Sequence, residues 1–329
     1  MVGQSAGHPV FLYLSRKSIK DWAGSIREAS RIWGNEVTFL LPATERHREF
    51  YTFAHMETMI LYADSGSTKT EWLGRNGQTE VFRHTTPGIN PFLMSSEQIE
   101  QMLLAEPALM RVANDAHEIR FYGAGCRGTA CHTVRTALER VFKQAQRIAV
   151  DSDLAGAAWA LFADGDGIAC ILGTGSNSGL FVDGKLVAQV SPLGYILGDE
   201  GSGAVLGRRL VGDVLKGQLP PTLCEEFLRT YPLSTDEFVQ RVYREPMPNR
   251  FLASFAPFLH KHRQEEAVRQ LLTEEFERFF RRNVAAYQRP DLPVGIVGSI
   301  AFYFKQEVVE AAAHCGFRVD KVMKGVYNL

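Results

Sequence analysis

The segment "MILYADSGSTKTEWL", residues 59–73, decides the fold class of this 329-residue chain. Its apolar run "MILYAD" predicts a short strand, "SGST" predicts a tight turn of small residues, and "KTEWLG" predicts a second strand. The segment therefore predicts a β-hairpin over residues 60–73, with glycine and hydroxyl side chains at its tip. Residues 1–58 precede it, so its position inside the chain needs an explanation.

A second strand–turn–strand unit follows at residues 168–182, with "GTGSNSG" at its tip. Helical and strand patterns alternate around the two units, which predicts an α/β protein. The predicted helices cover residues 97–115, 129–145, 154–163 and 200–217, and further strands are predicted at 118–125 and 147–153. Recurrence of the same unit predicts two related lobes that face each other.

The rest of the chain completes this division. Residues 222–289 have a helical pattern, and phenylalanines at helical spacing, such as Phe255 and Phe276, indicate packed core rather than a cofactor site. A strand, a Gly–Ser turn and a helix are predicted over 292–316. We therefore expect an extension without motifs at 1–58, a first lobe at 59–149, and a second lobe with a helical insertion at 150–329. Translation from Met56 or Met59 would fit this interpretation.

Composition favours a globular protein that acts on a small substrate. Hydrophobic residues make up 45% of the chain and charged residues 22%, and the formal net charge is −1. Lys and Arg do not cluster, so neither nucleic acid nor a membrane is expected as a partner. A cytoplasmic location is expected, because the first residues lack the features of a secretory signal and no apolar run is long enough to cross a bilayer.

The five cysteines also fit a reducing compartment, because their number is odd and most are isolated. The close pair in "CRGTAC", Cys126 and Cys131, has two interpretations. One is a corner of a metal or iron–sulfur site, which would need further ligands beyond His132. The other, which we favour, is a pair of ordinary thiols near a turn.

The two Gly/Ser/Thr tips suit phosphate binding. Small residues let backbone N–H groups approach phosphate oxygens, hydroxyls add donors, and Lys69 adds positive charge. Asp64, at the end of the first strand, could hold the water shell of a phosphate-bound Mg²⁺. Either tip alone could be an ordinary hairpin turn, but the pair together favours a nucleotide site. Neither tip is a Walker P-loop, because the required spacing is absent.

Four motifs in this order carry a family resemblance: "ADSGSTKTEW" (63–72), "GTGSNSG" (173–179), "GYILGDEGSG" (194–203) and "VGSIAFYF" (297–304). Together they resemble the BadF/BadG/BcrA/BcrD ATPase family of the sugar kinase, heat-shock 70 and actin superfamily. Within that family they are most similar to N-acetylglucosamine kinases. The resemblance covers residues 59–329 and implies two ribonuclease H-like, actin-like ATPase lobes around an interlobe nucleotide and sugar cleft.

The resemblance also implies roles for individual residues. Thr68 and Thr174 would contact ATP, and Asp64 would contact Mg²⁺ through water. The whole implied nucleotide set is Asp64, Gly66, Ser67, Thr68, Lys69, Thr70, Gly173, Thr174, Gly175, Gly298 and Ser299. The implied amino-sugar ligands are Asn90, Ser176, Asn177, Gly194 and Asp199.

Asp153, in "VDSDLAGAAWAL" (150–161), matches the family's general base. A sugar hydroxyl is a weak nucleophile, so a carboxylate must accept its proton as the phosphoryl group arrives. A helix N-cap is the competing interpretation of Asp153, because Asp is a favoured cap and a helical pattern follows at once. Asp151 is the nearby competitor for the base.

The chain departs from the kinase pattern at Leu193, where related kinases have an aromatic residue stacked near the sugar. The leading function is ATP-dependent phosphorylation of N-acetylglucosamine to its 6-phosphate, with glucosamine as the next substrate. One alternative is an ATPase that activates an iron–sulfur dehydratase or reductase, which would need cysteines beside the second phosphate motif. A non-catalytic actin-like module would need the acidic residues to be lost. The sequence leaves the exact sugar and the assembly, monomer or homodimer, open.

Overall fold

The computed structural model describes residues 10–13, 37–40, 51–52, 58–66 and 68–327 of the chain. The chain divides into two compact units, Met1–Thr58 and Met59–Leu329. In the first unit, β1 (Val10–Tyr13) pairs in parallel with β2 (Val37–Leu40), which pairs antiparallel with β3 (Tyr51–Thr52). Apart from Thr58, the rest of the first unit, including Met56, lies outside the described residues.

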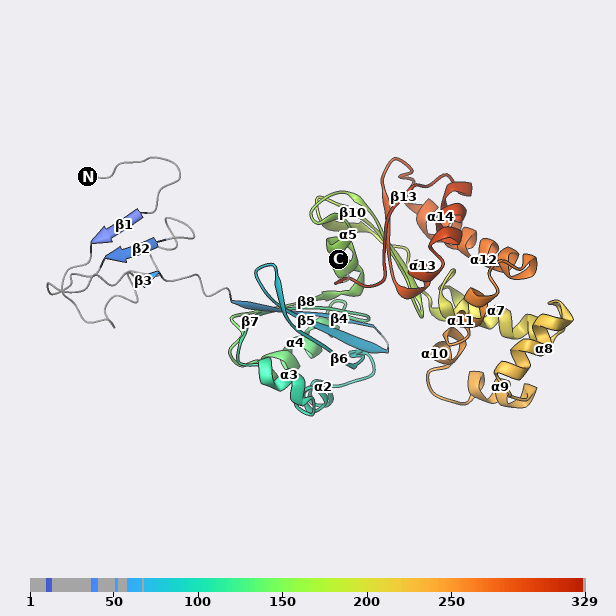
Figure 1. The fold of residues 1–329 in the computed structure, drawn as a ribbon, viewed down its shortest axis with the longest axis horizontal. Helices are drawn as coiled ribbons and strands as arrows, with labels where there is room; N and C mark the ends of the chain where they lie inside the picture. The colour runs from blue at the N-terminus through green and yellow to red at the C-terminus, as the bar shows by residue number, and fades with distance from the viewer. Residues whose placement is uncertain (1–9, 14–36, 41–50, 53–57, 67, 328–329) are drawn as a thin grey trace. The chain divides into compact units, whose positions relative to one another are not determined.

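The second unit contains two five-stranded sheets (Figure 1). The first sheet has the order β6-β5-β4-β7-β8, in which β4, β5 and β6 are antiparallel neighbours and β4, β7 and β8 are parallel. Its strands are β4 (Met59–Ser65), β5 (Lys69–Asn76), β6 (Thr79–Pro87), β7 (Ala116–Gly123) and β8 (Arg147–Ser152). The predicted hairpin is therefore confirmed as β4 and β5.

The second sheet has the order β11-β10-β9-β12-β13 and the same pattern of pairing. Its strands are β9 (Gly167–Leu172), β10 (Ser176–Val182), β11 (Lys185–Ala188), β12 (Val294–Val297) and β13 (Val319–Met323). The α/β fold class with two related lobes is thus confirmed. The exact lobe boundaries at residues 149 and 150 stay a prediction.

Helices up to residue 162 follow the sequence with one difference. Those of the first lobe are α2 (Ser96–Leu104), α3 (Pro107–Val112) and α4 (Ala130–Val141), and α5 (Asp153–Phe162) begins the second lobe. The single helix predicted over 97–115 is two helices, because Pro107 lacks an N–H and disfavours helical geometry in the residue before it. Pro107 instead begins α3, at the first helical position.

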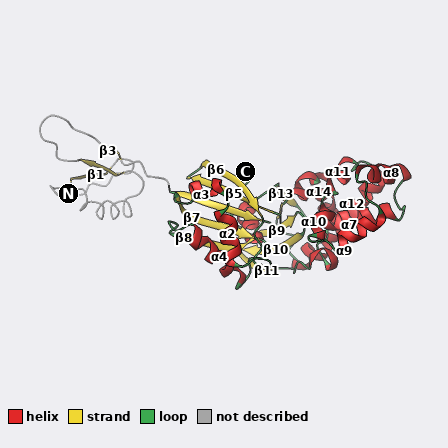
Figure 2. Cartoon of the chain, turned by 90° about the horizontal axis from the view of Figure 1, so that it is seen from below, coloured by secondary structure: helices red, strands yellow, loops and turns green. Residues whose placement is uncertain are grey.

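The second lobe carries the helical insertion that the sequence predicts. Figure 2 shows helices α7 to α12 and α14 gathered at one end of this unit, beyond the strands. The helices are α6 (Gly194–Leu197), α7 (Gly203–Leu215), α8 (Pro221–Thr230), α9 (Thr235–Tyr243), α10 (Pro248–Ala253), α11 (Ala256–Lys261), α12 (Glu266–Phe279), α13 (Ser299–Tyr303) and α14 (Lys305–His314). A π-helical turn, Phe280–Val284, and a 3₁₀ turn, Ala285–Tyr287, continue α12.

Each lobe has its own hydrophobic core, and a third cluster joins them. Phe255, Phe276 and Phe279 are fully buried in the second-lobe core, which confirms that the phenylalanine stripes are packing surfaces. The third cluster centres on α5, whose Leu154 and Ala157 pack with residues of both sheets. In the described part of the chain, no helix is long and apolar enough to span a membrane.

Removal of residues 1–55 should leave the second unit folded and able to bind ATP. The reason is that the unit Met59–Leu329 has its own sheets and hydrophobic cores. A chain that starts at Met56 should be soluble and melt within a few degrees of the full chain, as measured by circular dichroism. Insolubility, or loss of ATP binding in a fluorescent-nucleotide titration, would show that the first unit is structurally required.

Candidate active site

The turn between β4 and β5 is held against the segment that follows β6. The Ser65 hydroxyl accepts the Ile89 N–H at 2.9 Å and lies 2.8 Å from the Thr70 hydroxyl. The Thr70 hydroxyl also donates to the Pro87 carbonyl at 3.1 Å. Asp64, Gly66 and Thr68 are left facing a cavity, whereas Thr70 is fully buried beneath them.

The turn between β9 and β10 is held by the start of α7. The Gly203 N–H donates to the Gly173 carbonyl at 2.8 Å, and the Ala204 N–H donates to the Thr174 carbonyl at 3.1 Å. Beside this turn, Gly298 has a φ of +133°, and a Cβ there would lie 2.1 Å from the Leu172 carbonyl oxygen. Only glycine fits this close approach of two strand ends, and it brings the start of α13 against the turn between β9 and β10.

A third wall comes from the C-terminal segment after β13. Lys324, Gly325 and Val326 line the cavity, and the Val326 N–H donates to the Asp64 carboxyl. The Lys324 ammonium group donates to the Tyr303 hydroxyl at 2.9 Å and lies 5.0 Å from the centre of that ring. The cavity is about 740 Å³ in volume, which is within the range of small-ligand sites.

Asp64 is a buried carboxyl of this cavity with a strongly raised pKa. Burial raises its pKa to about 7, and the nearby carboxyls of Asp153 and Glu71 act in the same direction. The Val326 N–H and Lys69 lower it by smaller amounts. Because the ionised form of this carboxyl is disfavoured, a bound cation would stabilise it.

Asp153 is the first residue of α5, directly after the N-cap. That cap is Ser152, whose hydroxyl accepts the Ala155 N–H at 3.2 Å. The interpretation of Asp153 as the cap is therefore wrong, and its carboxyl lines the cavity. Burial raises its pKa, whereas the Leu154 N–H and the Arg127 guanidinium lower it. Asp151 is exposed and does not line the cavity.

Asp199 lies in the turn between α6 and α7 with a positive φ of 53°. Burial raises the pKa of its carboxyl, whereas N–H groups of Ser176 and Gly194 donate to it and lower the pKa. Next to it, the Asn177 side-chain oxygen accepts from the Gln189 amide at 2.9 Å. On the opposite lobe, the Asn90 side-chain oxygen accepts the Phe92 N–H at 3.0 Å.

The cavity brings together most of the residues that the sequence singles out. Those that line it are Asp64, Gly66, Thr68, Lys69, Asn90, Asp153, Gly173, Thr174, Gly175, Ser176, Asn177, Gly194, Asp199, Gly298 and Ser299. The structure does not bring Thr70 to the cavity, and Ser67 lies outside the described residues. The binding and catalytic roles of these residues stay predictions.

Sequence reasoning missed several cavity residues, among them Phe92, Arg127 and Lys324. A usable signal exists for two of them. Arg127 follows the glycines that end β7, and Lys324 directly follows β13. Because ligands of open α/β sheets bind beyond the carboxyl ends of parallel strands, residues just after each strand were candidates.

Solved structures share this fold. A protein named "Putative N-acetylglucosamine Kinase" from Porphyromonas gingivalis matches at 45% identity with a TM-score of 0.81, covering 82% of this chain and 96% of its own. A Chromobacterium violaceum protein with the same name matches at 19% identity and a TM-score of 0.63, covering 82% and 96%. A ROK family glucokinase from Streptomyces griseus, in complex with glucose and AMPPNP, matches at 16% identity and a TM-score of 0.50, covering 81% and 93%. The last two show likeness of fold alone.

Comparisons with protein-family models and with curated proteins found no match. The identity to the Porphyromonas gingivalis protein, over nearly its whole length, is sufficient by itself to assign a family. This chain therefore belongs to the family of that protein, a family of sugar kinases with the two-lobed actin-like ATPase fold.

Proposed function

We propose that this sugar kinase transfers the γ-phosphoryl group of ATP to an N-acetylated amino sugar, with N-acetylglucosamine and its 6-phosphate as the first substrate and product. One observation carries the proposal: Asp64, Asp153 and Asp199 line a single cavity between two glycine-rich turns. Such a cavity can hold phosphates at the turns and a sugar at the carboxyls. The name of the Porphyromonas gingivalis protein supports the same substrate, and we place the chain in the BadF/BadG/BcrA/BcrD ATPase family.

The residues present fit ATP and Mg²⁺. Backbone N–H groups and hydroxyls at Thr68 and Thr174 suit phosphate oxygens. Gly298 and Ser299, which line the same cavity, suit the nucleoside. Ionised Asp64 beside Asp153 and Glu71 lacks a full counter-charge, so it suits a hydrated Mg²⁺. Mg²⁺ held there would neutralise charge on the phosphates during transfer.

Asp153 would act as the general base. Its carboxyl would accept the proton of the sugar hydroxyl as that oxygen forms its bond to the γ-phosphorus and the bond to the β-phosphate oxygen breaks. Asp199, Asn177 and Asn90 would orient the sugar by hydrogen bonds. Closing the lobes around both substrates would exclude water, which would otherwise compete for the phosphoryl group.

A side pocket of about 60 Å³ beside Asp199 supports an N-acetylated substrate. It shares Ser176, Asn177, Pro192 and Asp199 with the main cavity. Its further lining includes the apolar Val190, Leu193 and Leu197 and the polar or charged Glu200, Arg282 and Asn283. One water-sized group needs roughly 10–15 Å³ of such space, so the pocket has room for the few non-hydrogen atoms of an acetyl group. Val190, Leu193 and Leu197 suit a methyl group, and the polar residues of the lining, Asn177 among them, suit an amide.

The enzyme should phosphorylate N-acetylglucosamine in preference to glucose, and filling the side pocket should remove the preference. Leu197→Trp should raise the KM for N-acetylglucosamine by about tenfold and leave the KM for glucose nearly unchanged. Ile196→Trp is the matched control, because Ile196 lies in the same short helix and is equally exposed but does not line the pocket. Coupled ADP release with N-acetylglucosamine, glucosamine, N-acetylmannosamine and glucose measures both effects.

Two outcomes would contradict this prediction. Glucose turnover equal to that of N-acetylglucosamine would overturn the proposed substrate, and Leu193 in place of an aromatic residue is the feature that would explain it. Equal effects of the two tryptophan variants would show that the side pocket does not hold the acetyl group.

The iron–sulfur activator is less well supported. Among the described residues that line the cavity, none is a cysteine. Burial raises the pKa of the Cys126 thiol to about 12, which disfavours the thiolate that a cluster needs. Anaerobic purification separates the two functions, because the activator would be brown and absorb near 400 nm, roughly where iron–sulfur clusters absorb.

A further inference from the structure

The turn from Gly198 to Gly201, which carries Asp199, has an unusual backbone. Asp199 has a φ of +53° and Gly201 a φ of +71°. Non-glycine residues with positive φ are uncommon and persist where the surroundings enforce them. A Cβ at Gly201 would lie 3.2 Å from the Cβ of Phe279 and 3.3 Å from the ring of Phe276. The turn is therefore pressed directly against α12.

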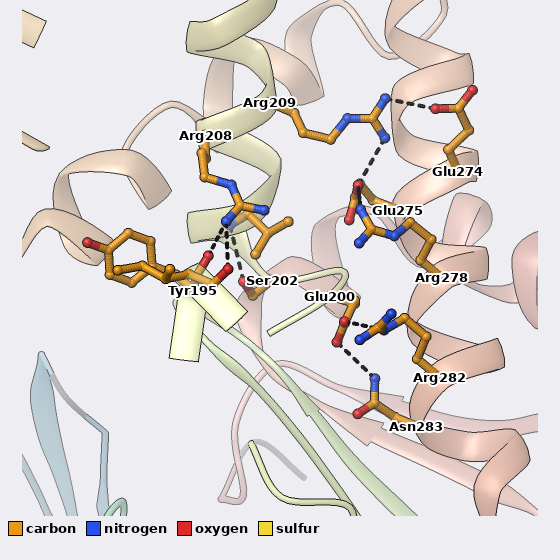
Figure 3. Close-up of polar contacts among 12 residues, drawn as sticks. Tyr195, Glu200, Ser202, Arg208, Arg209, Glu274, Glu275, Arg278, Arg282 and Asn283 are labelled. Atoms are coloured by element: carbon orange, nitrogen blue, oxygen red, sulfur yellow. Dashed lines mark hydrogen bonds and ion pairs between the residues drawn. The ribbon is translucent and has the colours of Figure 1, made fainter. Parts of the chain in front are cut away.

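Glu200, between these two residues, is the anchor of the turn. Its side chain is only 7% exposed. One carboxylate oxygen lies 2.6 Å from Nε of Arg282, and the other accepts from the side-chain amide of Asn283 at 3.2 Å (Figure 3). A buried carboxylate is stable only when it is paired in this way, so the contacts fix the orientation of the Glu200 backbone.

The π-helical turn Phe280–Val284 explains how two consecutive residues reach one carboxylate. In an α-helix, successive side chains diverge by about 100° around the axis. A π-helical turn contains more residues per turn, so the angle between neighbours is smaller. Here Arg282 and Asn283 point together at Glu200, and the Asn283 amide also donates to the Phe279 carbonyl at 3.3 Å.

A second anchor holds the other side of the Asp199 carboxyl. The Arg208 guanidinium, on α7, donates to the Tyr195 carbonyl, and at 3.4 Å to the Ile196 carbonyl (Figure 3). These carbonyls belong to α6, the short helix whose Gly194 N–H donates to Asp199. Asp199 thus lies between α6, which Arg208 fixes, and Glu200, which the π-helical turn fixes.

We propose that Glu200, Arg282 and Asn283 form a positioning group that holds Asp199 in its left-handed conformation with the carboxylate toward the sugar. The proposal rests on the proposed role of Asp199 as a sugar ligand. The three residues lie beside Asp199 and line the side pocket next to it, but none of them lines the main cavity, where the ATP contacts are proposed. Disturbing them should therefore weaken sugar binding and leave ATP binding intact.

An exchange of partners tests the proposal. Asn283→Asp places a second carboxylate against Glu200 and should raise the sugar KM by about tenfold or more, with the ATP KM changed less than about twofold. The double variant Glu200→Gln with Asn283→Asp again pairs one carboxylate with one amide. The amide at position 200 now donates, and the carboxylate at position 283 accepts. Its sugar KM should return to within about threefold of the wild-type value.

The matched control is Glu275→Gln, which alters another buried glutamate between the same helices. Glu275 is fully buried in α12 and accepts from Arg209 at 3.0 Å and from Arg278 at 2.8 Å (Figure 3). It does not line the cavity, so the variant should melt at a lower temperature while its sugar KM stays unchanged.

Three results would overturn the proposal: a sugar KM raised equally by the Glu275 variant, an ATP KM that rises in step with the sugar KM, or a folded double variant without recovery. Failure of the proposed substrate is a separate result, because it is seen in the wild-type sugar panel. If glucose is the better substrate, the same variants are assayed with glucose.

Discussion

Replacing Asp153 by asparagine should lower sugar-dependent ADP release by about 10²–10⁴-fold, the usual contribution of a general base. Asparagine keeps the size of the side chain and can still accept the Leu154 N–H, which now lies 2.9 Å from the Asp153 carboxylate. It cannot accept the proton of the sugar hydroxyl. Because Ser152 caps α5, the melting temperature should change little. ATP affinity should change less than about twofold, since the proposed ATP contacts lie on the two turns.

Asp151→Asn is the matched control, since Asp151 is two residues away on the preceding strand but exposed and outside the cavity. Its turnover should stay within about twofold of the wild-type value. Steady-state kinetics, a nucleotide titration and a melting curve on both variants complete the test. Near-normal turnover of the Asp153 variant would remove this residue from the mechanism and direct the search to Asp199, which lines the same cavity.

Replacing Asp64 by asparagine should stabilise the protein at alkaline pH and abolish its activity. Below pH 3.8 the carboxyl is protonated in both the folded and the unfolded chain, so its ionisation does not affect stability. Between pH 3.8 and about 7 the unfolded chain ionises first, and stability falls as pH rises. Above pH 7 the carboxyl is ionised in both states. Its ionisation then lowers the free energy of unfolding by about 4 kcal/mol, the value that corresponds to this pKa difference.

Melting curves between pH 5 and pH 9, recorded in EDTA without nucleotide, measure this effect. The variant should melt progressively higher than the wild type as pH rises, and the difference should level off above about pH 8. Added Mg²⁺ and ATP should narrow the difference, because they would bind only the wild-type carboxylate well. Equal melting temperatures at all pH values would show that Asp64 ionises without cost and would remove the argument for a cation there.

Much of the fold could be predicted because its signals are local. The hairpin at 59–73 is marked by two apolar runs around small residues, and the same holds for β9 and β10. The prediction of a single helix over 97–115 is wrong. The apolar residues keep their helical spacing across Pro107, but the backbone cannot stay helical there. Periodicity records which face is buried, whereas the proline determines where the helix ends.

Residues of the candidate site could be predicted where small residues and carboxyls directly follow a strand. The other residues of the site depend on contacts between segments far apart in the sequence. Thr70 alternates with its neighbours along β5, and strand alternation turns its hydroxyl inward to Ser65, away from the cavity. Lys324 reaches the cavity only because β13 pairs with β12, a contact between segments far apart in sequence. The Glu200 anchor depends on the π-helical turn, for which the sequence has no periodic signal.

The two sheets have the same strand order and the same pattern of parallel and antiparallel pairs. The β4–β5 and β9–β10 turns therefore hold equivalent positions in the two sheets. Their side chains differ, because the first strand ends on Asp64 and Ser65, and the second ends on the apolar Leu172. The site is thus chemically asymmetric although the two sheets that frame it share one topology.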